Sequence, residues 1–154
     1  MLFRTHIAFG IFIYLLFFSY FRNPILTLIG FLIGIIIVDL DSKKSKFGKK
    51  WYFRPIQWFT KHRRFFHSFI FGIIGTGIIA IYSVEMAFGF LVGFTTHIIL
   101  DSQTRRGVAP FHPLIDTKIK GKIKTGGIIE DIIFVILLLS DALLVLVNTF
   151  IILQ

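Results

Sequence analysis

The stretch that decides the fold class is IIEDIIFVILLLSDALLVLVNTFIIL, Ile128–Leu153, which is apolar apart from a few polar positions. A membrane-spanning helix needs about 20 mainly apolar residues, so this segment is long enough to cross a bilayer. Before it in the chain, four shorter apolar segments approach that length: Ile7–Phe21, Ile25–Leu40, Phe65–Val84 and Met86–Leu100. Backbone polar groups inside lipid must find partners within their own segment, which favours helices. We therefore predict an all-α integral membrane bundle of about five transmembrane helices, forming a single domain over residues 1–154.

The composition supports a membrane protein. Of the 154 residues, 55% are hydrophobic and 16% are charged, and the mean hydropathy is +0.82. A soluble domain carries about 25% charged residues. The charges here are gathered between the apolar segments, which membrane spans explain better than a soluble core. The chain contains no cysteine, so a bound metal would have to be held by His, Asp and Glu.

The basic residues predict the orientation. All 17 lysines and arginines except Arg22 lie at Arg4 or in the ranges 42–66 and 102–127. With five spans these regions share one side, which the positive-inside rule places in the cytoplasm, leaving the C-terminus outside. The chain would then be a multi-pass protein of the cell membrane whose basic loops contact lipid headgroups. Because the charges follow the loops, we do not expect nucleic acid as a partner, despite a net charge of +9.

Two features concern helices in or near lipid. Aromatic and basic residues interleave over Lys49–Thr60, which predicts an amphipathic helix lying in the membrane interface. Small residues let helices approach closely in a bilayer, and we predict packing positions at Gly72, Gly75, Gly77, Gly89 and Gly93.

The ionisable residues fall at the predicted cytoplasmic ends of all five segments. They are His6, Asp39, Asp41, His62, His67, His97, Asp101, Glu130 and Asp131. Each alone is best explained as an interface residue that pairs with a nearby Arg or Lys. Charged groups beside hydrocarbon are costly, however, and tend to be paired or functional. Their gathering at one membrane face therefore favours a shared site.

A site of this composition suits a metal ion. His97 and Asp101 are four residues apart on one helix, so they share a face. Histidine and carboxylate ligands without sulfur favour Zn²⁺, with Mn²⁺ or Fe²⁺ as alternatives, and the number of candidates allows one or two ions. The arginines Arg63, Arg64, Arg105 and Arg106 could bind phosphate, although each serves equally well as an orientation signal.

Three stretches also match the motifs of a known family. Val38-Asp39-Leu40-Asp41 resembles its P-D-x-D motif, and KHRRFFHS, residues 61–68, resembles its G-H-R-x-x-T-H-S motif. The run GFTTHIILDSQTRRGV, residues 93–108, resembles its G-x-x-x-H-x-x-x-D-x-x-T-x-x-G-V motif. On these motifs the chain resembles the YdjM-like family of membrane-bound metal-dependent hydrolases. It departs from the pattern at Val38, where the family has proline, and at Phe66, where it has threonine.

The resemblance implies a divalent metal and a hydrolytic activity. On this basis we predict metal ligands at His6, Asp39, Asp41, His67, His97 and Asp101, a general base at His62 or Glu130, and substrate-binding arginines at Arg63, Arg64 and Arg105. The substrate would be a phosphoester or a lipid at the cytoplasmic leaflet. The alternatives are a metal-ion transporter and a non-catalytic membrane scaffold. A transporter would need polar residues through the depth of the membrane, and the first four segments have few of them.

Overall fold

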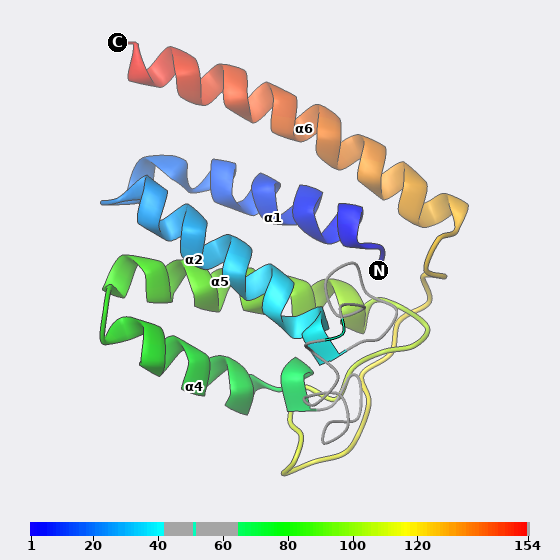
Figure 1. Cartoon of the computed structure of the whole chain (residues 1–154). Helices are drawn as coiled ribbons and strands as arrows, with labels where there is room; N and C mark the ends of the chain where they lie inside the picture. The colour runs from blue at the N-terminus through cyan, green and yellow to red at the C-terminus, as the bar shows by residue number, and fades with distance from the viewer. Residues whose placement is uncertain (42–50, 52–64, 154) are drawn as a thin grey trace.

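The computed structural model describes residues 1–41, 51 and 65–153 (Figure 1). The described residues form five α-helices and no strand. The helices are α1 (Phe3–Leu16), α2 (Pro24–Ile37), α4 (Phe69–Ala80), α5 (Val84–Ser102) and α6 (Ile128–Ile152), with short 3-10 turns η1 (Phe18–Tyr20), η2 (Val38–Asp41) and η4 (Phe65–His67). Residues 103–127 run without a helix and contain two isolated β-bridges. The predicted all-α class is therefore confirmed.

Capping residues explain where three helices begin. The side chain of Asn23 accepts a hydrogen bond from the Leu26 N–H, and Pro24 occupies the first turn of α2. Ser68 accepts from the Phe71 N–H at the start of α4, and Ser83 accepts from the Met86 N–H at the start of α5. These side chains satisfy backbone donors that have no partner within the helix. The helices consequently begin at the caps, and not where the apolar runs begin.

The helices differ in length from the predicted spans. With a rise of about 1.5 Å per residue, the 25 residues of α6 and the 19 of α5 are long and apolar enough to cross a membrane. The helices α1, α2 and α4 have 14, 14 and 12 residues, which is shorter than a full span of about 20. Two helices thus pass the length criterion among the described residues, and the five-span topology stays a prediction. The predicted interfacial helix Lys49–Thr60 lies outside the described residues, apart from Trp51.

The core is built on close packing of α2 against α5. A Cβ atom on Gly89 or Gly93 would lie 2.1 Å from a carbonyl oxygen of α2, so neither position has room for a larger side chain. Gly30 and Gly34 meet the α5 backbone in the same way from the other side. Phe90 and Phe94 fill the space between α5 and α4, against Gly75 and Gly72. Four of the five predicted glycines pack closely as expected, whereas no atom of the described residues lies within 4 Å of a Cβ built on Gly77.

The outer helix α6 lies along α1 at one side of the bundle (Figure 1). Most of its surface is not covered by the rest of the described chain. The start of α1, η2, η4, the end of α5 and the start of α6 all lie at one end of the bundle, on the right in Figure 1. This end therefore collects the residues that the sequence places at the helix ends.

Candidate metal centre

His97 lies at the centre of the polar cluster at this end of the bundle. Its Nδ1 is 2.8 Å from the carbonyl oxygen of Ile35 on α2, and the ring is buried. A carbonyl only accepts hydrogen bonds, so Nδ1 must carry the proton in the neutral ring. The lone pair is then on Nε2, which makes no hydrogen bond within the described part of the chain. The α2 backbone thus sets both the tautomer and the orientation of a potential ligand.

His6 on α1 stacks on the His97 ring. The ring centroids are 3.9 Å apart and the ring planes differ by 12°. The side chain is 1% exposed, and neither ring nitrogen has a hydrogen bond of good geometry among the described residues. Asp101, one turn after His97 on α5, places its Oδ1 3.3 Å from the Nε2 of His6. The terminal amino group of Met1 also contacts this carboxylate.

His67 and Asp39 complete the cluster from the other two segments. The His67 ring is fully buried in η4 and lies edge-on to His97, with ring centroids 5.7 Å apart. Its Nε2 is 3.7 Å from Oδ2 of Asp101. Asp39 in η2 places its Oδ1 3.9 Å from Nε2 of His97. Five side chains from α1, η2, η4 and α5 therefore meet in one place.

The donor atoms fit a small divalent cation. They form two groups, His6–His97–Asp101 and Asp39–His67–His97, each with ligand atoms within 4.8 Å of one another. Tetrahedral zinc with bonds of about 2.0–2.1 Å holds its ligand atoms about 3.3 Å apart, which is the separation of the His6 and Asp101 atoms. Imidazole nitrogen and carboxylate oxygen are also the donor set that zinc, manganese and iron accept. The residues present fit the ion that the sequence predicts.

The residues after Asp101 complete the motif over residues 93–108, and their roles are structural. Thr104 is buried, and its hydroxyl donates to the Asp101 carbonyl at 2.8 Å, which ends α5 beside the cluster. Gly107 has a φ of 64°, a conformation that glycine adopts at little cost. Val108 is fully buried and pairs with Ile119 through two backbone hydrogen bonds. These motif positions shape the turn and do not supply ligands.

Both carboxylate oxygens of Glu130 accept hydrogen bonds from the protein. Its Oε1 accepts from the Leu2 N–H at 2.6 Å and from the Thr5 hydroxyl at 3.0 Å, and its Oε2 accepts from the Gly126 N–H at 2.6 Å. Within the described residues, neither group of potential ligands includes it. Its neighbour Asp131 pairs with Arg4 where both side chains are about half exposed.

Most of the other predicted site residues lie where the structure describes no side chain. His62, Arg63 and Arg64 lie outside the described residues, and Asp41 ends η2 with a side chain that the structure does not describe. Arg105 is exposed, and its Nε donates to the Lys122 carbonyl at 3.2 Å. The contact of the Ile35 carbonyl with His97 could not be predicted from the sequence, because any residue type supplies a backbone carbonyl.

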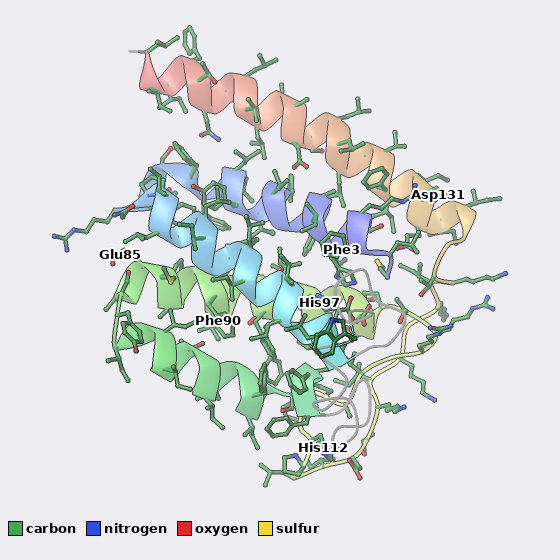
Figure 2. All side chains as sticks on the ribbon, viewed as in Figure 1. Phe3, Glu85, Phe90, His97, His112 and Asp131 are labelled. Atoms are coloured by element: carbon green, nitrogen blue, oxygen red, sulfur yellow. The ribbon has the colours of Figure 1, made fainter. Side chains whose placement is uncertain are left out.

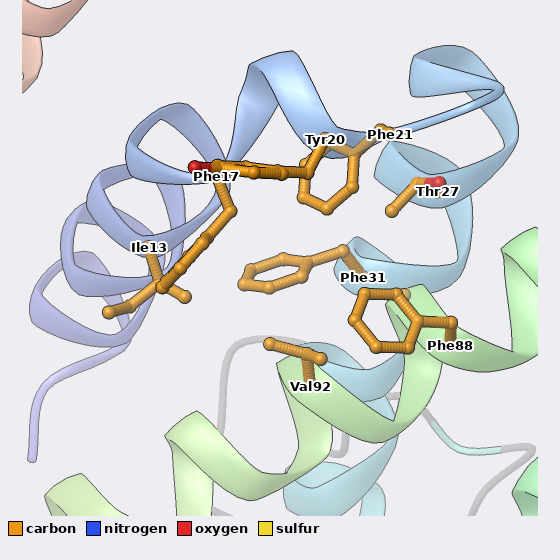
Figure 3. Close-up of a pocket in the computed structure, with 9 residues that line it drawn as sticks. Ile13, Phe17, Tyr20, Phe21, Thr27, Phe31, Phe88 and Val92 are labelled. Atoms are coloured by element: carbon orange, nitrogen blue, oxygen red, sulfur yellow. The ribbon is translucent and has the colours of Figure 1, made fainter.

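The opposite end of the bundle has a different character. Figure 2 shows Glu85 at that end, far from His97. An apolar pocket of about 240 Å³ lies there between α1, η1, α2 and α5 (Figure 3). Its lining consists of Ile13, Phe17, Tyr20, Phe21, Thr27, Phe31, Phe88, Gly89 and Val92. None of these lining residues is a histidine or a carboxylate, so the candidate metal ligands of the described residues lie at the other end of the bundle.

Comparison with known proteins identifies a matching family and a similar protein. A family model described as YdjM inner membrane protein matches residues 1–153. The chain is also 28% identical over 124 residues to the uncharacterized protein YvsG of Bacillus subtilis (strain 168), covering 77% of this chain and 78% of that protein. No solved structure matches the chain.

Proposed function

The chain belongs to the YdjM inner membrane protein family, and from that premise we propose that it is a membrane-bound metal-dependent hydrolase. The observation that carries the proposal is the cluster of three histidines and two aspartates at one end of the bundle, in which every member except Asp39 is buried. Buried polar groups are normally hydrogen-bonded, whereas both ring nitrogens of His6 and the Nε2 of His97 have no such partner among the described residues. A cation between them would satisfy these atoms.

Each side chain has a defined part in this proposal. His6, His97 and Asp101 hold one divalent ion, Zn²⁺ in the first instance, and Asp39 and His67 complete its surroundings. Such an ion supplies an activated water and polarises the bond to be cleaved. The Ile35 carbonyl keeps the His97 ring in its binding orientation. The general base stays with His62, because both oxygens of Glu130 already accept hydrogen bonds.

The basic residues of the segment that follows α5 support a substrate class. Arg105, Arg106 and the lysines of residues 118–124 are exposed in the segment that follows α5. Arginine matches the oxygens of phosphate well. We therefore propose a phosphoester or lipid substrate that reaches the site from the cytoplasmic leaflet.

A matched pair of histidine variants tests this proposal. We expect the detergent-purified protein to contain bound metal in elemental analysis, and His97→Ala to lose it. His112→Ala is the control, because His112 pairs with Asp116 on the 103–127 segment and is not a member of either ligand group. Hydrolysis of p-nitrophenyl phosphate, bis-p-nitrophenyl phosphate and phospholipid is then measured with the metal-loaded protein. Absence of metal from the wild type would overturn the proposal, and metal without turnover of any substrate would favour a non-catalytic role.

A further inference from the structure

Glu130 is a fully buried carboxylate that joins three parts of the chain. It lies in the first turn of α6 and is 0% exposed. It accepts one hydrogen bond from the segment before α6, through the Gly126 N–H, and two from the start of α1, through the Leu2 N–H and the Thr5 hydroxyl. Charge-assisted hydrogen bonds of this kind are among the stronger ones in proteins. The carboxylate therefore fixes the start of α1 to the start of α6.

The start of α1 has no cap of its own. Leu2 is the capping residue, and it offers no side-chain acceptor to the first turn. The Glu130 carboxylate, which comes from a different helix, takes this place and puts a negative charge at the positive end of α1. This contact is connected to the metal cluster through the first turn of α1. The Leu2 carbonyl accepts from the N–H groups of Thr5 and His6, so the anchored turn is the one that carries His6.

We infer that Glu130 is a positioning residue, which holds His6 against His97 and Asp101 by capping α1 from the neighbouring helix. This inference rests on the proposed metal centre and gives Glu130 a different part from the general base that the sequence suggested. Without this carboxylate, the Arg4–Asp131 pair and the hydrogen bond from Asn148 to the Leu15 carbonyl would still join α1 to α6, but the turn that carries His6 would lose its cap. The His6 ring stacks on His97 with a centroid distance of 3.9 Å, and its place there depends on where the first turn of α1 lies.

Two isosteric variants on the same turn separate positioning from general stability. Glu130→Gln keeps the shape of the side chain but removes its charge and presents an amide donor to one of the three N–H and O–H groups. Asp131→Asn makes the same chemical change at the adjacent position, where the carboxylate pairs only with Arg4 at the surface among the described residues. We expect Glu130→Gln to weaken Zn²⁺ binding by about 10- to 100-fold, and Asp131→Asn to leave it unchanged.

A double-mutant cycle with His6→Ala shows whether the effect passes through His6. If Glu130 acts by positioning that ring, Glu130→Gln weakens Zn²⁺ binding in the wild type but has no further effect in the His6→Ala background. Equal losses in both backgrounds would overturn the inference and reduce Glu130 to a general support of the fold. Should Glu130→Gln not fold, Thr5→Val removes one donor to the carboxylate, and the same cycle is run with it.

The metal-free protein provides a second readout that does not depend on the proposed function. With ¹⁵N-labelled histidine, the His6 ring signals are identified as those missing from His6→Ala. We expect Glu130→Gln to shift these signals and to leave those of His112 in place, while Asp131→Asn shifts neither. Unchanged His6 signals in Glu130→Gln would overturn the inference. A wild-type protein that binds no metal would overturn the proposed function alone, because the NMR comparison still decides the role of Glu130.

Discussion

At the scale of single residues, Gly107 shows how the turn after the metal cluster is fixed. Its φ of 64° is unfavourable for any residue with a side chain. A Cβ atom there would also lie 2.3 Å from the carbonyl oxygen of Ile119, which pairs with Val108. Two separate costs thus fall on one position. The turn matters to the cluster because its first residues end α5 just beyond Asp101.

We expect Gly107→Ala to lower the free energy of unfolding more than Gly126→Ala does. Gly126 has a similar φ of 73°, but nothing lies within 4 Å of its missing Cβ. Gly126→Ala should cost about 1–2 kcal/mol for the left-handed conformation alone, and Gly107→Ala about 1–3 kcal/mol more for the collision. Thermal unfolding in detergent, followed by circular dichroism, measures both. Equal losses would show that the Ile119 contact is unimportant.

The sequence could predict the residues of the cluster because each lies at the end of an apolar segment. His6, Asp39, His67, His97 and Asp101 were expected at one face, and the structure brings them together. The hydrogen bonds that Glu130 accepts could not be predicted from the sequence. Its partners are two backbone N–H groups and a threonine hydroxyl, and donors of this kind occur throughout any sequence.

At the scale of helices, the contact between α2 and α5 depends on glycines from both partners. Gly89 and Gly93 were expected to pack because small residues let helices approach closely, whereas Gly30 and Gly34 on α2 were not among the predicted positions. Each pair faces the backbone of the other helix. This close approach is what carries the Ile35 carbonyl to His97.

A pair of alanine substitutions tests this contact. We expect Gly93→Ala to destabilise the protein by about 1–3 kcal/mol, because its Cβ would collide with the Phe31 carbonyl. Gly77→Ala in α4 should instead be neutral or stabilise by up to about 1 kcal/mol, since the site is open and alanine favours a helix. The comparison uses thermal unfolding of the two purified variants. A Gly93→Ala protein as stable as wild type would show that the α2–α5 backbones can separate without loss.

The lengths of the helices were harder to predict than their existence. The apolar runs gave the order of all five helices, but hydropathy does not register Asn23, Ser68 and Ser83 as caps. These residues place the helix starts and shorten α4 in particular, which begins at Phe69 and ends at Ala80. Hydropathy measures preference for lipid, whereas helix boundaries depend on local hydrogen bonds.

At the scale of the whole molecule, the arrangement of the helix ends gives a prediction about topology. The turn between α4 and α5 lies at the end of the bundle opposite His97, and the 103–127 segment follows the end of α5 (Figures 1 and 2). If the basic segments face the cytoplasm, the α4–α5 turn faces outward. The structure gathers these helix ends at one end of the bundle, as the sequence predicts. Which end faces the cytoplasm is predicted from the basic residues alone.

Cysteine labelling in intact cells tests this direction, because the chain has no cysteine of its own. We expect Tyr82→Cys, at a position that is 84% exposed in the α4–α5 turn, to react with a membrane-impermeant maleimide. Thr117→Cys, in the exposed part of the 103–127 segment, should react only after the cells are broken. The reverse pattern would place the metal cluster at the outer face and exclude a cytoplasmic substrate.

His97 also limits how many ions the site can hold. It belongs to both ligand groups, yet one of its nitrogens is committed to the Ile35 carbonyl, so only Nε2 is available for coordination. One nitrogen lone pair binds one ion. When an ion binds to either group, His97 is no longer available to the other group. The two groups therefore cannot both bind an ion through His97, and a titration with Zn²⁺ should saturate at one equivalent per chain.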